Sequence, residues 1–263
     1  MDLNNFNLYD DEEARLLSQQ KKRKTRKKRS NKKKIWLFVV LVLITTCYFI
    51  SDFSKVKSIQ VRGNIFYYDK DVSEKMNISY DSRYLLTYPS FLYENKLKKD
   101  PLIKKVQMKT KLDGTITIDI EEKQVIGYYI DQKTNQLSLL LEDGTSKAID
   151  QDHEKQILKF AYIEGFDQKQ MQEIAKAFME GKEKVSSEIL AMISEIRPYS
   201  ESYDQNMLKI VMQDGNTFYT SLSTLHQMNA YSAVLKDLKN DNVCFVMIPN
   251  TDMIQTEDCS AFK

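Results

Sequence analysis

Two adjoining stretches, KKRKTRKKRSNKKK (Lys21–Lys34) and IWLFVVLVLITTCYFI (Ile35–Ile50), decide how this chain is organised. The first stretch holds eleven Lys or Arg residues in fourteen positions, and the second holds sixteen residues without a formal charge. At 1.5 Å per residue, a helix over the uncharged stretch is about 24 Å long, and one that continues to Phe53 is about 28 Å long. Since the hydrocarbon core of a bilayer is about 30 Å thick, the sequence predicts a transmembrane helix over 35–53.

The charge distribution predicts the orientation of this helix. Residues 1–34 carry 12 basic and 5 acidic side chains, a net charge of +7, and the other residues carry 27 and 32, a net charge of −5. The positive-inside rule therefore places a basic tail, 1–34, in the cytoplasm and the bulk of the chain outside the cell membrane. Basic and aromatic residues at this interface are predicted to contact anionic lipid headgroups. This predicted membrane-surface anchor consists of Lys27, Lys28, Arg29, Lys32, Lys33, Lys34 and Trp36.

Three other interpretations of these stretches are less favoured. A buried core helix seldom shows sixteen residues without a polar face. A cleavable signal peptide usually has a shorter apolar region and a shorter basic region, and residues 51–54 make a poor cleavage site. A nucleic-acid patch would need aromatic side chains among the basic ones, and the run has none. The polar residues ahead of the basic run, around Asp10–Glu13, are predicted to be a disordered stub.

Composition bounds what the rest of the chain can do. With 263 residues and 42% hydrophobic residues, there is room for one large or two small domains with proper cores. Three cysteines exclude a disulfide-rich scaffold and a four-cysteine zinc site. His153, between Asp152 and Glu154, is predicted to be solvated, and His226 to lie on a surface or to cap a helix. Cys244 is predicted to be a buried thiol, although pairing with Cys259 stays open.

The first module outside the membrane is predicted to span 54–124 in the order β-α-α-β-β. A strand near Val56–Val61 precedes a helix with Val72 and Met76 on one face, and Ser90 caps a second helix with Phe91, Leu92 and Leu97 as its apolar side. Strands then flank the Asp113-Gly114 turn. The strand after this turn alternates Ile116, Ile118 and Ile120 with polar residues, which predicts one buried face and one wet face.

These residues resemble a known domain. The pattern Val56-x-x-Ile-x-Val-x-Gly-Asn64, then Leu92…Leu97…Pro101-x-Ile103-x-x-Val106, then Thr115-Ile-x-Ile-x-Ile-Glu121 resembles a POTRA domain. With the basic tail and the single span, it is similar to the bacterial cell-division family DivIB/FtsQ. Gln124 stands where that family often has proline. The resemblance implies a divisome protein, with FtsL and DivIC/FtsB-type division proteins as partners.

The second module, 125–250, is predicted to be a mixed α+β domain built on antiparallel hairpins, which makes the whole chain α+β. Asp143-Gly144 and Asp214-Gly215 mark hairpin turns. Asp167 is predicted to cap a helix, and Ser223 a second one; their apolar stripes are interpreted as core. The helix after Asp167 has Met171, Ile174 and Phe178 as its stripe and Gly181 near its end, and the one after Ser223 has Leu225, Met228, Tyr231 or Ser232, Leu235 and Leu238.

The last apolar strand is the predicted partner-binding site. A strand near the end of a domain often lies at a sheet edge, where unpaired backbone groups can accept a further strand. The family resemblance implies that partners bind there; a central strand buried on both faces is the structural alternative. The candidate residues are Val243, Cys244, Phe245, Val246, Met247 and Ile248. The tail, 251–263, is predicted to be loosely ordered.

The predicted function is that of a non-enzymatic, membrane-anchored scaffold of the division septum, which helps to regulate septal peptidoglycan synthesis. No catalytic, metal-binding or cofactor-binding residue is predicted, and neither nucleic acid nor a small-molecule substrate is expected. One alternative is a membrane-anchored cell-wall hydrolase or transferase, which should show a polar cleft with converging His, Asp, Glu or Ser. The other is a POTRA-type chaperone for exported chains, which usually carries tandem POTRA repeats or a barrel.

Overall fold

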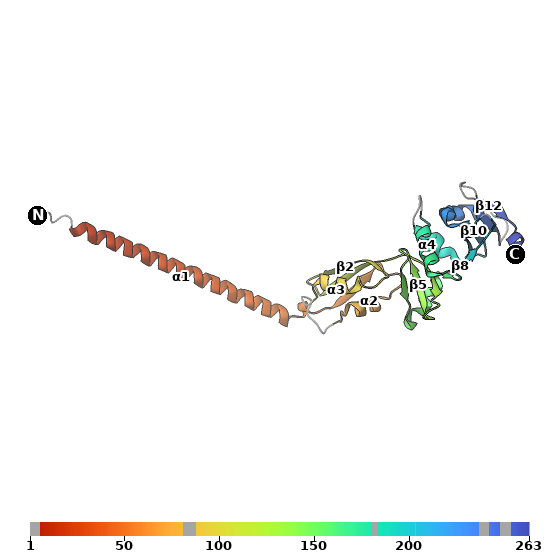
Figure 1. The fold of residues 1–263 in the computed structure, drawn as a ribbon. Helices are drawn as coiled ribbons and strands as arrows, with labels where there is room; N and C mark the ends of the chain where they lie inside the picture. Colours follow the sequence, from red (N-terminus) through yellow and green to blue (C-terminus); the bar gives the residue numbers. More distant parts are fainter. Residues whose placement is uncertain are drawn as a thin grey trace. The chain divides into compact units, whose positions relative to one another are not determined.

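The computed structural model describes residues 6–80, 88–179, 184–202, 204–236, 242–247 and 254–262. These residues form an α+β protein that begins with one long helix (Figure 1). The chain packs as two units, which are described separately. The first holds residues up to 58 together with 79–88 and 110–116, and the second holds 59–78, 89–109 and 117–263.

The first unit contains α1 (Phe6–Ile50) and the short 3-10 helix η1 (Asp52–Ser54). Two predictions need correction here. The segment ahead of the basic run is helical from Phe6 instead of a disordered stub, because Glu, Ala, Arg, Leu, Gln and Lys are all good helix formers. The helix also ends at Ile50 and not at Phe53. Residues 32–50 have the length and hydropathy of a membrane span, and their side chains are not buried by the protein.

A three-stranded sheet in the order β1-β3-β2 forms the first globular module. Its core includes Val72, Met76 and Leu97 from the helices and Ile116, Ile118 and Ile120 of β3, which confirms the predicted buried face. The opposite face is not wet throughout, because Thr117 is buried as well. Phe91 and Leu92, predicted on the buried side of their helix, are instead 60% and 51% exposed. The elements are β1 (Ser58–Arg62), α2 (Asp69–Met76), α3 (Ser90–Leu97), β2 (Ile103–Thr110) and β3 (Thr115–Glu122).

A nine-stranded mixed sheet follows, in the order β12-β11-β10-β9-β8-β7-β4-β5-β6 (Figure 1). The predicted hairpins are present, but three pairs of strands are parallel: β4 with β7, β7 with β8, and β10 with β11. The strands are β4 (Val125–Ile130), β5 (Leu137–Leu141), β6 (Ser146–Ala148), β7 (Ala161–Ile163), β8 (Ile193–Tyr199), β9 (Met207–Met212), β10 (Thr217–Ser221), β11 (Cys244–Met247) and β12 (Ile254–Glu257).

Helices pack on this sheet around one continuous core that includes Phe178, Ile210, Phe218, Tyr231 and Phe245. Asp167 accepts a hydrogen bond from the Gln170 amide and caps α4 as predicted; Gly181 and Leu238 lie outside the described residues. Ser223 does not cap a helix: a 3-10 helix begins at Leu222 and only one α-helical turn follows. The helices are η3 (Gln151–Lys159), α4 (Gln168–Met179), α5 (Ser187–Met192), η4 (Leu222–Ala230), α6 (Tyr231–Val234) and η5 (Cys259–Phe262).

The three Asp-Gly turns share one geometry. Each glycine has a positive φ, between 75° and 94°, which residues with a Cβ rarely adopt. Each aspartate accepts a hydrogen bond from the backbone amide two residues later, and each glycine amide donates to the carbonyl three residues earlier. The pairs are Asp113-Gly114, Asp143-Gly144 and Asp214-Gly215.

Candidate partner-binding surface

The predicted binding strand, β11, is not the edge of its sheet. It pairs in parallel with β10 on one side and antiparallel with β12 on the other. Phe245 is fully buried, and its ring stacks on that of Phe218 at a centroid distance of 4.7 Å. Cys244 and Met247 are also buried, whereas Val243 and Val246 are half-buried and Ile248 lies outside the described residues. The edge position of 243–248 was therefore predicted wrongly, because a further strand follows it.

The edge strand is β12, within the segment predicted to be a loose tail. Cys259 forms a disulfide with Cys244, so the prediction of a free buried thiol is also wrong. Beyond it, the Phe262 ring stacks on that of Tyr219 at 4.2 Å. This disulfide and this aromatic contact hold 254–262 against the sheet, which is why the segment is ordered.

The outer side of β12 has the properties of a docking edge. Gln255 and Thr256 are exposed, and Ile254 and Glu257 are half-buried. The strand is last in the sheet order, so among the described residues no strand pairs with its outer side. An edge strand of this kind presents alternate backbone N–H and C=O groups outward. The other edge, β6, has three residues, and its Lys147 is engaged with Asp100 at 3.0 Å.

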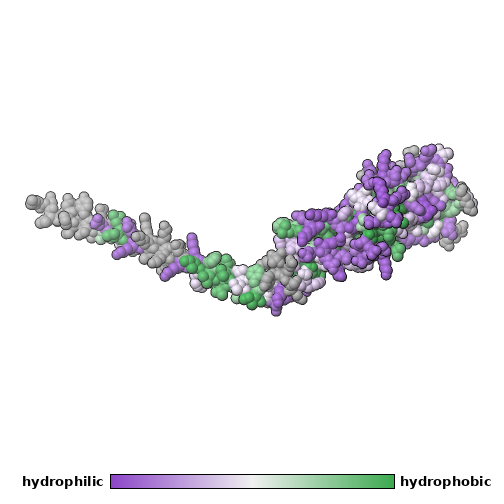
Figure 2. Space-filling model, turned by 60° about the horizontal axis from the view of Figure 1, so that its bottom comes forward, coloured by the Kyte–Doolittle hydropathy of each residue, from purple (hydrophilic) through white to green (hydrophobic). Residues whose placement is uncertain are grey.

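The predicted membrane-surface anchor lies on α1. Lys32, Lys33, Lys34 and Trp36 are exposed, and Trp36 keeps 70% of its surface. The side chains of Lys27, Lys28 and Arg29 lie outside the described part of the chain. Figure 2 shows a hydrophobic band on the helix next to polar residues. This juxtaposition suits an interface between lipid tails and headgroups.

The described residues do not form a metal-binding group of three or more His, Cys, Asp or Glu side chains. One hollow in the described part of the chain, about 750 Å³ in volume, has Tyr129, Ser146, Glu164 and Asp167 in its wall and neither histidine among its lining residues. The Glu122 carboxylate has a structural role, because it accepts hydrogen bonds from the backbone amides of Phe66 and Tyr67. Burial raises the pKa of Glu122 despite these hydrogen bonds.

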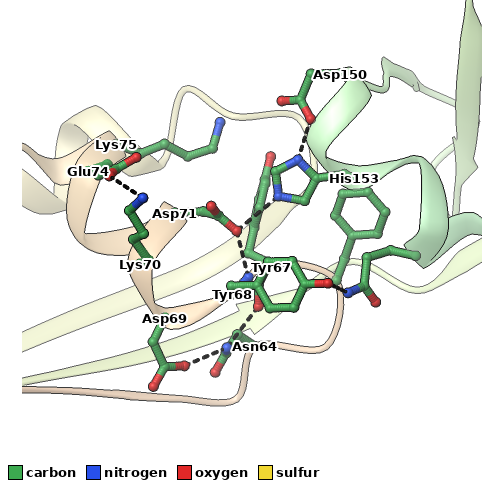
Figure 3. A network of polar contacts seen from close by, with 12 residues as sticks. Asn64, Tyr67, Tyr68, Asp69, Lys70, Asp71, Glu74, Lys75, Asp150 and His153 are labelled. Atoms are coloured by element: carbon green, nitrogen blue, oxygen red, sulfur yellow. Dashed lines mark hydrogen bonds and ion pairs between the residues drawn. The ribbon is translucent and has the colours of Figure 1, made fainter.

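His153 is the residue most clearly misjudged from the sequence. It was predicted to be solvated, but it is only 5% exposed. Its Nε2 atom lies 2.9 Å from a carboxylate oxygen of Asp71, and Nδ1 contacts Asp150 (Figure 3). Its burial arises from residues 82 positions away in the chain, which the local Asp-His-Glu pattern does not reveal.

Comparison with known proteins places this arrangement in a class. A family model described as "POTRA domain, FtsQ-type" matches residues 54–123. The chain is thus a POTRA protein that carries a helix long and apolar enough to cross a membrane. It is 32% identical to the cell division protein DivIB of Bacillus cytotoxicus over 200 residues, which cover 76% of this chain and 75% of that one. The chain belongs to the DivIB family of bacterial cell division proteins.

Two further matches are to proteins with the same name, DivIB. The DivIB of Erysipelothrix rhusiopathiae is 26% identical over 214 residues, which cover 81% of this chain and 77% of the relative. A solved structure of the major extracytoplasmic domain of DivIB from Geobacillus stearothermophilus, in its trans isomer, has a TM-score of 0.35 and 20% identity; the match covers 45% of this chain and 95% of that one.

Proposed function

We propose that this protein is a non-enzymatic scaffold of the divisome that captures a partner segment by strand addition to the outer side of β12. The observation that carries the proposal is the exposed outer edge of Ile254–Glu257, which the Cys244–Cys259 disulfide fastens to the sheet. An extended partner segment paired there would become a tenth strand. Main-chain hydrogen bonds would provide affinity, and alternate side chains would provide specificity.

By family resemblance, the partners are FtsL-type and DivIC/FtsB-type division proteins at the septum, where the complex would help to regulate peptidoglycan synthesis. The orientation follows the charge split, with the basic tail in the cytoplasm and both globular modules outside. A fluorescent fusion should then form a septal band, and an even distribution around the membrane would contradict the septal part of the proposal.

The decisive experiment compares two proline variants of adjacent residues, Gln255→Pro and Thr256→Pro. In an antiparallel strand, successive amides point to opposite sides, so one of the two faces β11 and the other faces outward. Proline removes the amide donor. We expect one variant to remain folded yet lose capture of full-length FtsL-type and DivIC-type proteins, and the other to lose the β11 pairing.

A second comparison places a charge on an exposed strand position at the edge and in the middle of the sheet. The control is Ser194→Lys, because Ser194 is an exposed residue of the central strand β8. Ser194→Lys should leave capture unchanged, and Thr256→Lys should reduce it. Folding is checked by circular dichroism and thermal unfolding. If both proline variants remain folded and capture both partners as well as the wild type does, strand addition to β12 is wrong.

A further inference from the structure

A second feature lies far from β12. His153 and its surroundings, the His153 cluster, join η3 to the first turn of α2 within the second packing unit (Figure 3). The imidazole is nearly fully buried, and both of its nitrogens face carboxylates. Asp71 stands on α2, whereas Asp150 immediately precedes η3. The ring therefore connects two segments that lie 82 positions apart in the chain.

The chemistry of the two contacts identifies the charge state that they need. An ionised carboxylate only accepts hydrogen bonds, and a neutral imidazole has one N–H donor and one acceptor nitrogen. A neutral His153 could donate to Asp71 or to Asp150, but the other contact would bring two acceptors together. Only the imidazolium, which has two N–H donors, satisfies both carboxylates at once.

The contact between His153 and Asp71 also bears on the start of α2, because the same carboxylate oxygen of Asp71 takes part in the cap of that helix. It accepts the Tyr68 backbone amide at 2.7 Å, the reciprocal bond of a helix capping box. It also receives His153 Nε2 at 2.9 Å. The bond from His153 thus acts directly on the group that caps α2.

Aromatic rings enclose the imidazole. Phe66 stacks on it at a centroid distance of 5.4 Å and Tyr68 at 6.0 Å, and Tyr67 meets it edge-on at 5.6 Å. Rings within about 6 Å stabilise a cation over their faces. The Tyr68 hydroxyl also accepts a hydrogen bond from Gln156 of η3, so that the two segments are joined beside the ring as well.

The charges around the cluster are predominantly negative. Asp71 and Asp150 contact the ring. Asp100 accepts a hydrogen bond from the Tyr67 hydroxyl, and Glu122 accepts one from the Tyr67 backbone amide. Lys75 and Lys147 pair with Asp100 at 3.1 Å and 3.0 Å. The neighbours of His153 on η3, Asp152 and Glu154, are exposed. Without a charge on His153, two lysines face three half-buried carboxylates, Asp71, Asp100 and Glu122, and the exposed carboxylate of Asp150.

We propose that His153 is a pH-dependent latch: as the imidazolium it fastens η3 to the capped end of α2, and on losing a proton it releases one of the two carboxylates. Environmental pH would then control how firmly the POTRA module and the nine-stranded sheet are held together at this point. The latch adds a means of regulation to the scaffold and does not depend on the site at β12.

The direction of the pH effect follows from the contacts. Burial alone lowers the pKa of His153, but the hydrogen bonds to Asp150 and Asp71 outweigh it and raise the pKa above its ordinary value. A group whose pKa is raised by folding stabilises the folded state fully below its unfolded pKa, which is about 6.5 for histidine. This stabilisation is lost as the pH rises through the higher pKa of the folded protein.

The test uses the full-length protein in detergent micelles, labelled with ¹³C at the histidine Cε1 positions. The chain has two histidines, so the variant His226→Gln assigns the signal of His153. The expected pKa of His153 is higher in the folded protein than in the urea-unfolded protein, and Asp71→Asn should lower it. Asp152→Asn, a change at an exposed carboxylate on η3, should leave it almost unchanged.

Hydrogen exchange provides the structural readout. Below pH 6.5, amides of η3 and of the first turn of α2 should be better protected in the wild type than in His153→Gln measured at the same pH. Each unit by which folding raises the pKa corresponds to about a tenfold difference in the opening equilibrium. The difference should disappear at higher pH. A folded-state pKa of His153 at or below that of the unfolded protein would overturn the proposal, even if His153→Gln does not fold.

Discussion

Removing the Cys244–Cys259 disulfide is the sharpest test of how β12 is held in place. The bond closes a loop of 15 residues, and the loss of a cross-link over such a loop costs about 3 kcal/mol in chain entropy. In the variant Cys259→Ser, β12 keeps its pairing with β11 and the stacking of Phe262 on Tyr219. We expect these contacts alone to hold β12 less firmly, so that the strand detaches from β11 more often than in the wild type.

The magnitude can be measured as hydrogen exchange of the amides of residues 254–257. If the lost stability is concentrated in β12, about 3 kcal/mol corresponds to an increase in exchange on the order of 100-fold. Amides of the central strand β9 should change much less, because local opening of an edge does not require global unfolding. Capture of division proteins should weaken in the same variant if partners bind at β12.

Cys47→Ser is the matched control, because Cys47 is the free cysteine and lies on α1. It should change neither the exchange of β12 nor capture. Reduction of the wild type without mutation should reproduce the effect of Cys259→Ser and so separate the bond from the loss of the sulfur atom. If Cys259→Ser exchanges its β12 amides at the wild-type rate and unfolds at the same temperature, the disulfide does not hold β12 closed.

The remaining predictions concern the core, the sheet and the membrane anchor. Phe178→Ala empties a fully buried position and should lower the free energy of unfolding by about 3–5 kcal/mol, measured by urea denaturation. Gly127→Ala should destabilise the protein by about 1–3 kcal/mol in the same assay, because a Cβ there would lie 2.5 Å from the Ala161 carbonyl oxygen across the β4–β7 pair; an unchanged midpoint would contradict this close approach. Changing Lys32, Lys33 and Lys34 together to Glu should weaken binding to vesicles rich in anionic lipid more than binding to neutral ones, and equal binding to both would argue against a headgroup contact.

The parts of the fold that the sequence predicts are those with local signals. The alternation of Ile116, Ile118 and Ile120 identifies β3, and Asp-Gly pairs mark three hairpins correctly. Two of the three parallel pairings were missed because they involve β7, which has three residues and whose partners are distant in the sequence. The third joins β10 to β11, which are separated by more than twenty residues. Short strands between helices carry little periodicity by themselves.

In the candidate site too, the features with a local sequence signal were predicted and those that depend on distant segments were not. The final apolar strand is real, but its position in the sheet depends on β12, four residues with two exposed polar side chains and no clear hydrophobic pattern. Cys259 was the available signal: a second cysteine 15 residues after a buried one suggests an additional ordered segment. The burial of His153 had no comparable signal, because Asp71 and the aromatic rings around it come from the other module.

The geometry of the three Asp-Gly turns also bears on chemical ageing. Asp-Gly is prone to isoaspartate formation, in which the glycine amide nitrogen attacks the aspartate side chain and closes a succinimide ring. In all three turns the glycine amide already donates to a backbone carbonyl, and the aspartate carboxylate accepts the backbone amide two residues after it. We therefore expect the folded turns to form isoaspartate more slowly than the same Asp-Gly sequences in the unfolded chain.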